Sequence, residues 1–406
     1  MGNTVLLFES RDLCYESNRY FAQCLQKAFE GIGYPSEICD LSEGMDALEG
    51  ILKRQDEYLL AIDFNSLLPR LELEDGTPYL EAFHVPFYNY LVDHPLYHHA
   101  ALKRDLPNHS VICIDICHRN YLQGYYPRIR QVLYVPLGAM KAGLERSFGQ
   151  KRLELLFLGT YDSDAELYQQ LKEYPLEKER EVSALIEMMR ADPELTQEGA
   201  LGRYLEDKGE ILDGQAFARR LNGDYLADLY LRNLYRRQAV LAATRANVPM
   251  AVIGHGWEQV RELDQGHVSL YKGVGFAASL QMMADARMLL NATPGFHGGL
   301  HDRAYSAMIN RALCFTEGSR FARQALDGER EAVFYDIRNL HDLTEKIAYM
   351  HGHPRLVREM AERAYQKAAA RDTWEMRVTG FAAAVIPGYA KHANCILSQS
   401  EKSVII

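Results

Sequence analysis

Residues 288–310 read MLLNATPGFHGGLHDRAYSAMIN. The apolar run Met288–Leu290 predicts a buried strand, and the pattern of Arg303–Asn310 predicts a helix. Three glycines within five residues lie between them, and glycine lets backbone amides approach a ligand closely. The helix N-terminus then offers unpaired N–H groups and the positive end of its dipole. A strand, a glycine-rich loop and a helix in this order predict a phosphate-binding turn of an α/β sheet.

Polar side chains at the end of this loop complete the predicted phosphate site. His301 and Arg303 add hydrogen-bond donors, and an arginine can hold a phosphate through two parallel bonds. Asp302 has two interpretations: it accepts bonds from ribose hydroxyls, or it compensates the dipole of the helix. We expect Gly298, Gly299, His301, Asp302 and Arg303 to bind a nucleotide.

This segment belongs to a series of short apolar runs in the second half of the chain. The predicted strands are Leu153–Leu158, Pro249–Ile253, Val268–Leu270, Met288–Leu290, Ala312–Thr316 and Ala332–Phe334. Helical patterns lie between several of them, as in a doubly wound sheet. Because ligands bind beyond the carboxyl ends of parallel strands, residues that follow these strands are further donor-binding candidates. They are Gly159, Thr160, Gly254, His255, Trp257 and Glu317.

The first half of the chain carries a second series of apolar runs. They are Val5–Phe8, Tyr58–Ile62, Phe87–Val92, Val111–Asp115 and Val132–Val135. Helical patterns such as Asn18–Phe29 separate them, which predicts a parallel sheet covered on both faces. The fold class is therefore α/β, with two Rossmann-like parallel-sheet domains.

The remaining segments set the expected domain boundaries. Residues 164–246 are polar and helical by periodicity, which predicts a helical insertion in the second half. We expect an N-terminal domain over 1–150 and a C-terminal domain over 151–372, followed by a helix within 373–390. Residues 391–406 are polar and without a pattern, so we expect a loosely ordered tail.

Carboxylate, imidazole and amide side chains gather at the predicted strand ends of the first domain. The groups are Glu9-Ser10-Arg11-Asp12, Asp63-Phe64-Asn65, Asp93-His94-Pro95, and Asp115 with His118. One interpretation is that each acidic or amide residue caps the helix that follows. The other is that Asn65, Asp115 and His118 contact an acceptor molecule. Both interpretations stay open at this point.

Asp93 and His94 form the most suggestive of these groups. They follow an apolar run, and Pro95 restrains the loop behind them. A histidine with a pKa near neutral pH, beside a carboxylate, can take a proton from an acceptor hydroxyl. The alternative is that His94 only packs at the edge of the domain. We predict Asp93 and His94 as the catalytic pair.

The composition excludes several classes of function. The net charge is −10 and the sequence pI is about 5.8, and such an acidic chain is a poor nucleic-acid binder. No apolar run reaches the ~20 residues that a membrane helix needs, and residues 1–8 lack the pattern of a signal peptide. We therefore expect a cytoplasmic protein with reduced cysteines and no metal site. A Walker A motif, a G-x-G-x-x-G after the first strand and a G-x-S-x-G elbow are all absent.

The residues around the glycine-rich loop resemble those of a known enzyme group. His301-Asp302-Arg303, Ala307-Met308 and Ala312–Glu317 are similar to the motif of the spore-maturation (CgeB-like) group of family-1-type glycosyltransferases. The likeness continues downstream to Thr373-Trp374, and upstream it includes Phe64-Asn65, Val92–Pro95 and Asp115 with His118. It covers most of the chain, and the insertion is its least similar part.

The resemblance implies the GT-B fold, in which two Rossmann-like domains face each other across the active site. It implies that the first domain binds the acceptor, that the second binds a nucleotide-sugar, and that the last helices cross back to the first domain. It also implies that no metal or other cofactor is needed. The expected donor is a UDP-sugar, and the expected activity is that of a hexosyl- or N-acetylhexosaminyl-transferase acting on a protein, glycan or small-molecule acceptor.

One departure from the group bears on mechanism. Many retaining members carry two glutamates eight positions apart around the loop, and here Pro294 and Asp302 stand at the matching places. The first carboxylate is missing, which favours an inverting displacement with Asp93 or His94 as the base. Two alternatives stay open: a nucleotide-sugar epimerase, and a non-catalytic relative that acts as an interaction module. The sequence leaves the oligomeric state open.

Overall fold

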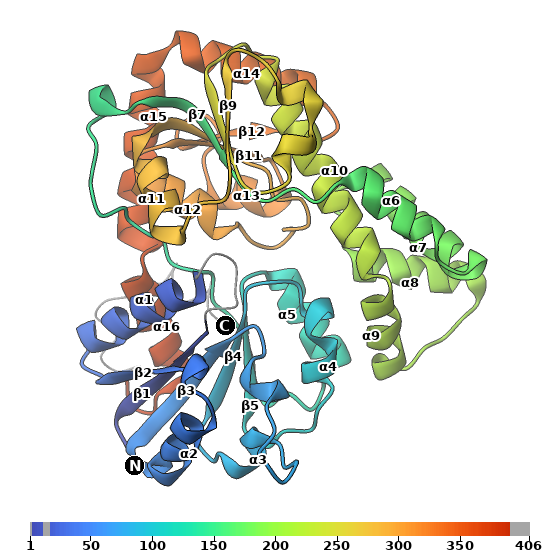
Figure 1. Ribbon diagram of the computed structural model, residues 1–406, viewed down its shortest axis with the longest axis vertical. Helices are drawn as coiled ribbons and strands as arrows, with labels where there is room; N and C mark the ends of the chain where they lie inside the picture. The colour runs from blue at the N-terminus through green and yellow to red at the C-terminus, as the bar shows by residue number, and fades with distance from the viewer. Residues whose placement is uncertain (1, 11–16, 390–406) are drawn as a thin grey trace. The chain divides into compact units, whose positions relative to one another are not determined.

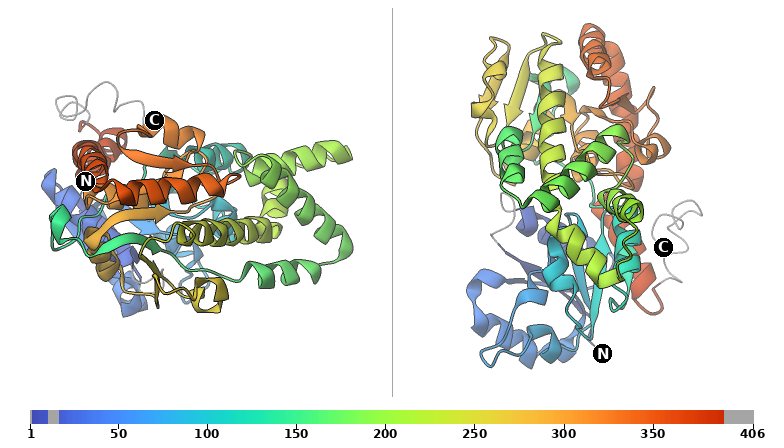
Figure 2. Two further views of the ribbon diagram at one scale, coloured as in Figure 1. Left: turned by 90° about the horizontal axis from the view of Figure 1, so that it is seen from above. Right: turned by 90° about the vertical axis from the view of Figure 1, so that its right-hand side faces the viewer.

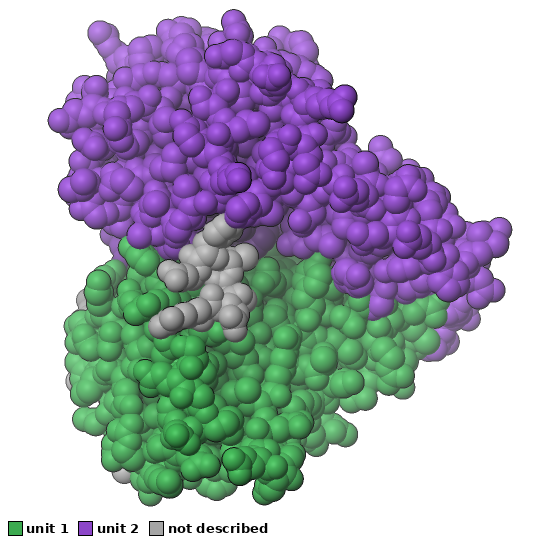
Figure 3. Space-filling model, viewed as in Figure 1, with its two compact units in different colours: residues 1–138, 212–222, 374–406 green, residues 139–211, 223–373 purple. Residues whose placement is uncertain are grey.

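The computed structural model describes residues 2–10 and 17–389 of the 406-residue chain. Two of the polar residues predicted at the first strand end, Arg11 and Asp12, and the expected tail at 391–406 lie outside the described residues. The chain divides into two compact units (Figure 3). Unit 1 takes residues 1–138, 212–222 and 374–406, and unit 2 takes residues 139–211 and 223–373.

Unit 1 is built on a six-stranded sheet in which every neighbouring pair is parallel (Figure 1). Its strands are β1 (Thr4–Glu9), β2 (Ser36–Asp40), β3 (Tyr58–Phe64), β4 (Phe87–Leu91), β5 (His109–Cys113) and β6 (Val132–Tyr134), in the order β2-β1-β3-β4-β5-β6. The sequence predicted all of these strands except β2. Of its five residues only Cys39 is buried, so this edge strand lacks the apolar run that marks the others.

Helices cover both faces of the sheet of unit 1. They are α1 (Ser17–Gly31), α2 (Met45–Lys53), α3 (Tyr79–Ala82), α4 (His99–Leu102), α5 (Ile116–Tyr125), α9 (Gly214–Gly223) and α16 (Trp374–Val385). The first and last of these pack together, with the ring centroids of Phe29 and Phe381 6.2 Å apart. Helix α9 joins unit 1 because the ring of Phe217 stacks on Tyr125 at 4.4 Å and Asn222 Nδ2 donates to the carbonyl of Leu96.

Unit 2 contains the second parallel sheet. Its strands are β7 (Leu153–Leu158), β8 (Met250–Ile253), β9 (Val268–Tyr271), β10 (Ala286–Asn291), β11 (Leu313–Glu317) and β12 (Ala332–Tyr335). They run in the order β12-β11-β10-β7-β8-β9, which is the 3-2-1-4-5-6 order of a Rossmann sheet read from the other edge. The strand order reverses between β7 and β10, and such a switch point is where doubly wound sheets bind ligands.

Unit 2 holds the other helices of the described chain. They are α6 (Asp164–Lys172), α7 (Leu176–Ala191), α8 (Gln197–Lys208), α10 (Tyr225–Thr244), α11 (Phe276–Asp285), α12 (Asp302–Ile309), α13 (Arg320–Ala325), α14 (Leu340–Gly352) and α15 (Pro354–Arg371). The predicted insertion at 164–246 forms the five helices α6 to α10 (Figures 1 and 2). The C-terminal half of α10 buries Ala239, Val240 and Ala243 against the sheet. Within 2–10 and 17–389, no helix combines the length and apolar character that crossing a membrane requires.

The units divide at residues 138 and 139, earlier than the boundary near 150 that the sequence suggested. The connecting segment is fastened to α12, since Met140 N donates to Ser306 Oγ at 3.2 Å and Ala142 N donates to Asn310 Oδ1 at 2.9 Å. The Nζ of Lys151 donates to three backbone carbonyls, those of Ala284, Ala286 and Asn310. These contacts attach residues 139–151 to unit 2.

Candidate functional site

The loops that follow β7 and β8 lie against each other at the carboxyl edge of unit 2. Gly159 N donates to the carbonyl of Ile253 at 2.9 Å. A Cβ atom at Gly254 would lie 2.2 Å from the carbonyl oxygen of Gly159, and one at Gly256 would lie 1.9 Å from that of Tyr161. Only glycine fits such contacts. The predicted Gly254, together with Gly256, therefore sets the spacing of the two loops.

Trp257, which the sequence placed among the donor-binding residues, is a buried anchor for these loops. Its side chain is only 1% exposed. The indole donates from Nε1 to the carbonyl of Gly159 at 2.7 Å, and its ring stacks on Tyr161 at 4.9 Å. His255, by contrast, is exposed, and its carbonyl accepts from Tyr161 N. Of these two candidates, only His255 has a side chain open to a ligand.

A hydrogen-bonded network holds the start of the glycine-rich loop after β10. Glu317 Oε1 accepts from the backbone N–H of Thr293 at 3.1 Å and from the hydroxyl of Tyr335 at 3.3 Å. The same hydroxyl lies 3.1 Å from the carbonyl of Asn291. Burial raises the pKa of Glu317 to about 7, although the two hydrogen bonds and the charge of Arg236 act in the opposite direction. Glu317 thus fixes the path of the loop.

His301 and Asp302 open helix α12. His301 caps the helix through Nδ1, which lies 3.2 Å from Arg303 N, and the same atom lies 2.5 Å from a carboxylate oxygen of Asp302. Desolvation lowers the pKa of His301, opposed by Asp302. Desolvation acts to raise the pKa of Asp302, but His301 and Arg303 outweigh it and the pKa is lowered. The predicted Gly298 and Gly299 are buried just before them.

Two arginines meet at this edge of the sheet. Arg303 Nη1 donates to Asn291 Oδ1 at 3.3 Å, and a Cβ atom at Gly159 would lie 3.8 Å from Arg303 Nη2. Arg236, from α10, donates from Nη1 to the carbonyl of Thr160. Its Nε is buried and has no hydrogen-bond partner. Among the residues that the structure describes, neither guanidinium forms an ion pair with a carboxylate.

The electrostatics of the two arginines favour an anionic ligand. Burial lowers the pKa of Arg236 to about 9, and the charges of Arg303 and Arg232 add to the effect. Partly buried cations that repel each other are stabilised by a bound anion. Sequence reasoning missed Arg236. The available signal was the four-residue spacing of Arg232 and Arg236, which places both on one face of a helix.

The carboxyl edge of unit 1 contains a strained turn. Asn65 and Ser66, after β3, have φ values of 52° and 61°, in the left-handed region that non-glycine residues rarely adopt. Asn65 Nδ2 donates to Asp93 Oδ2 at 2.8 Å, and Asn65 Oδ1 accepts from Val92 N at 2.9 Å. Ser66 N donates to Asn89 Oδ1 at 2.9 Å. A strained backbone conformation that surrounding hydrogen bonds hold in place is typical of functional sites.

His94 caps a 3₁₀ turn at Pro95–His98. Its Nδ1 accepts from Leu96 N at 3.0 Å, and its ring centroid lies 4.5 Å from that of His118. Because Nδ1 serves as an acceptor, the neutral imidazole carries its proton on Nε2 and acts there as a donor. The predicted pair thus lies at the carboxyl edge of this sheet, with Asp93 bonded to Asn65 and Nδ1 of His94 occupied by the backbone.

The structure separates the acceptor-side candidates of unit 1. Asn65, Asp93, His94 and His118 lie within one cluster. Asp115 is fully buried, and its Oδ1 accepts from Cys117 N, so it caps α5 (Ile116–Tyr125). Capping, one of the two interpretations of these residues, therefore accounts for Asp115.

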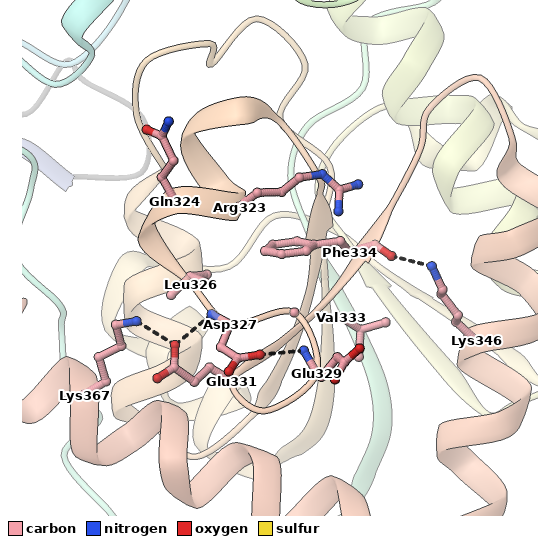
Figure 4. Close-up of a pocket in the computed structure, with 11 residues that line it drawn as sticks. Arg323, Gln324, Leu326, Asp327, Glu329, Glu331, Val333, Phe334, Lys346 and Lys367 are labelled. Atoms are coloured by element: carbon pink, nitrogen blue, oxygen red, sulfur yellow. Dashed lines mark hydrogen bonds and ion pairs between the residues drawn. The ribbon is translucent and has the colours of Figure 1, made fainter.

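A pocket of about 810 Å³ lies elsewhere in unit 2, along the edge strand β12 (Figure 4). Two lysines that line it have carboxylate partners: Lys367 pairs with Glu331 at 2.6 Å, and Lys346 pairs with Asp342 at 2.7 Å. Lys346 also donates to the carbonyl of Phe334, which protects the strand edge. None of the predicted site residues lines this pocket.

Comparison with known proteins gives one family match. A family model described as "Glycosyl transferase-like" matches residues 232–383. The matched segment begins within α10 and includes Arg236, the glycine-rich loop and Arg303. No protein of curated function matches the chain in sequence.

Solved structures resemble the whole chain in fold. Sucrose-phosphate synthase from Thermosynechococcus elongatus aligns with a TM-score of 0.56 and 10% identity, over 96% of this chain and 100% of that one. HepE of Anabaena, solved in complex with UDP-glucose, aligns with a TM-score of 0.54 and 11% identity, over 94% of this chain and 99% of that one. The likeness confirms the predicted GT-B fold class, with two Rossmann-like parallel sheets and a helical insertion in the second half.

Proposed function

We propose that the chain is a glycosyltransferase that moves a sugar from a nucleotide-diphosphate sugar to an acceptor hydroxyl. One observation carries the proposal. Arg236 and Arg303 reach the switch point of the Rossmann sheet of unit 2, beside the N-terminus of α12, without a carboxylate partner among the described side chains. A diphosphate supplies the charge that this arrangement lacks.

The comparisons support the type of reaction and the donor. The family model covers both arginines, and HepE, which shares the fold, binds UDP-glucose. We therefore propose a UDP-sugar donor and a hexosyl or N-acetylhexosaminyl group as the transferred sugar. Membership of the spore-maturation (CgeB-like) group and a protein, glycan or small-molecule acceptor belong to the same proposal.

The proposed mechanism needs no metal ion. As the bond between sugar and diphosphate breaks, negative charge develops on the departing nucleotide. Arg236, Arg303 and the N–H groups at the start of α12 stabilise that charge. In unit 1, Asp93 accepts the proton of the acceptor hydroxyl, and His94 donates a hydrogen bond from Nε2. Asn65 orients Asp93.

A thermal-shift screen against UDP, ADP, GDP and their glucose and N-acetylglucosamine conjugates tests the proposal. A ligand at 100 times its Kd adds about 2.7 kcal/mol of stability, which raises the Tm by several degrees. We expect a selective rise for one nucleotide and its sugar conjugates, lost in Arg303→Ala. Arg355→Ala is the matched control, because Arg355 is an exposed arginine on α15 of the same unit.

A flat response across the whole panel contradicts the proposal and favours the non-catalytic relative. A nucleotide-sugar epimerase shares the donor site but needs no acceptor. Incubating the protein with the selected nucleotide-sugar alone, followed by product analysis, separates the two enzymes, since only an epimerase converts the sugar while leaving it on the nucleotide.

A further inference from the structure

Helix α10, in the insertion, carries a charged stripe formed by Asp228, Arg232 and Arg236. These residues are four positions apart, so they lie on one face of the helix. Asp228 and Arg232 contact each other, with 3.2 Å between a carboxylate oxygen and Nη2. Their side chains are 21% and 29% exposed. The stripe is therefore in reach of a ligand.

The C-terminal end of the stripe is fixed to the loop after β7. Asn233, which is only 1% exposed, accepts a 2.9 Å bond from Asp162 N through its Oδ1. Arg236 donates to the carbonyl of Thr160 in the same loop. This end of the stripe thus belongs to the cationic, diphosphate-binding part of the candidate site.

The N-terminal end of the stripe lies over the glycine-rich loop. Gly295 has a φ of 96°, and a Cβ atom built there would lie 3.3 Å from Asp228 Oδ1. One carboxylate oxygen of Asp228 therefore faces the loop, while the other faces Arg232. Eight residues of helix separate Asp228 from Arg236, which is about 12 Å along the axis. That distance suits a ligand with a diphosphate at one end and a sugar ring at the other.

We propose that Asp228 selects the sugar of the donor by accepting hydrogen bonds from its hydroxyl groups. The inference rests on the proposed function, and it gives the insertion a part in substrate recognition. A carboxylate repels the phosphates and accepts hydrogen bonds from hydroxyl groups, so it discriminates the sugar end of the ligand from the diphosphate end. The ion pair between Asp228 and Arg232 is partly exposed, and such a pair by itself contributes little to stability or binding.

The test compares the wild type with Asp228→Asn and with Asp207→Asn. Asp207 is an exposed aspartate on α8 of the same insertion, so it is the matched control. Calorimetric titration gives the Kd of UDP, UDP-glucose, UDP-galactose and UDP-N-acetylglucosamine for each protein. In Asp228→Asn, we expect the Kd of UDP to change by less than about threefold. The advantage of the preferred UDP-sugar over UDP should fall by about tenfold to a hundredfold, the range for a hydrogen bond to a charged group.

The possible outcomes separate the inference from the proposed function. If wild-type protein binds neither UDP nor its sugar conjugates, the proposed UDP-sugar donor is wrong and the inference falls with it. If the wild type prefers a UDP-sugar and Asp228→Asn keeps the same preference, only the inference is overturned. An equal loss of UDP and UDP-sugar binding also overturns it, since Asp228 would then act by holding Arg232. Asp207→Asn should match the wild type throughout.

Discussion

Each unit places a histidine at the start of a helical turn, just beyond the carboxyl edge of its sheet. His94 in unit 1 accepts from the backbone N–H of Leu96 at 3.0 Å, and His301 in unit 2 lies 3.2 Å from that of Arg303. Both contacts use Nδ1. An aspartate is the sequence neighbour of each histidine, before it in unit 1 (Asp93) and after it in unit 2 (Asp302).

The neighbours of the two histidines differ in charge, and so does the chemistry they allow. His301 lies in the field of Arg303 and Arg236, which suits a bound anion. His94 packs against the rings of His118 and Tyr121, beside a carboxylate oriented by Asn65. Under the proposed function, the same capping geometry serves diphosphate binding in unit 2 and proton transfer in unit 1, and the neighbouring charges account for the difference.

The largest expected effect concerns Asp93, the proposed proton acceptor of unit 1. Asp93→Asn removes the base, and we expect kcat to fall by about 10²- to 10⁴-fold. His94→Gln keeps an N–H donor near the position of Nε2, so its kcat should stay within about tenfold of the wild type. Steady-state transfer assays with the donor identified by thermal shift measure both. The reverse ranking would make His94 the base and contradict the assignment of its proton to Nε2.

A second prediction concerns the close approach of the loops in unit 2. Gly256→Ala places a Cβ 1.9 Å from the carbonyl oxygen of Tyr161 at a residue with a φ of 87°. Overpacking and backbone strain together should lower the free energy of unfolding by about 3 kcal/mol. Differential scanning calorimetry shows this as a Tm several degrees lower. Gly266→Ala, where no atom lies within 4 Å of the new Cβ, is the control and should be nearly neutral.

Most of the fold could be predicted because buried parallel strands appear in the sequence as continuous apolar runs. Val5–Phe8 and Leu153–Leu158 are examples, and both lie in the strands observed. The edge strand β2 was missed because it buries only Cys39. The placement of α9 depends on the contact between Phe217 and Tyr125, which periodicity does not reveal.

The site could be predicted where its residues are contiguous in the chain. His301, Asp302 and Arg303 follow the glycine-rich loop directly, and the structure places them at the start of α12. Arg236 and Asp228 come from a helix that is distant in sequence, so only the folded chain brings Arg236 to the loop after β7 and Asp228 to the glycine-rich loop. Pro294 stands where many members of the resembled group carry a glutamate. Only the folded chain shows that a carboxylate oxygen of Asp228 lies beside the next residue, Gly295.

A third prediction contrasts the anion-binding arginines with the pair in unit 1. Arg303→Ala and Arg236→Ala should each weaken binding of UDP by about 1.5–3 kcal/mol, the range for a lost charge-assisted hydrogen bond. Asp93→Asn should leave UDP binding unchanged. Calorimetric titration with UDP gives the three values. If Arg303→Ala binds UDP as tightly as the wild type, the phosphate site is misplaced. A double variant that loses less than the sum of the two would indicate that the arginines hold the same phosphate.

The smallest effect concerns a buried carboxyl group in each unit. Burial raises the pKa of Glu317 and that of Asp63 to about 7. The folded protein therefore binds these protons more tightly than the unfolded chain does. The resulting stabilisation is complete below the unfolded pKa values, near pH 4, and it is lost as the pH rises to about 7. Each group should make the free energy of unfolding fall by on the order of 1–2 kcal/mol between pH 5 and pH 8.

Glu317→Gln and Asp63→Asn remove one titration each, so each variant should lose less stability than the wild type over the same pH range. Denaturant unfolding at pH 5, 6, 7 and 8 measures the slopes. Asp302→Asn is a control, because the pKa of Asp302 is lowered and its contribution is lost only at pH values below this range, so the slope should match that of the wild type. Asp63 keeps one carboxylate oxygen buried without a partner, whereas Glu317 Oε1 accepts two hydrogen bonds. If only Asp63→Asn flattens the profile, the network around Glu317 holds it ionised, and the edge of unit 2 then carries a full carboxylate near its two arginines.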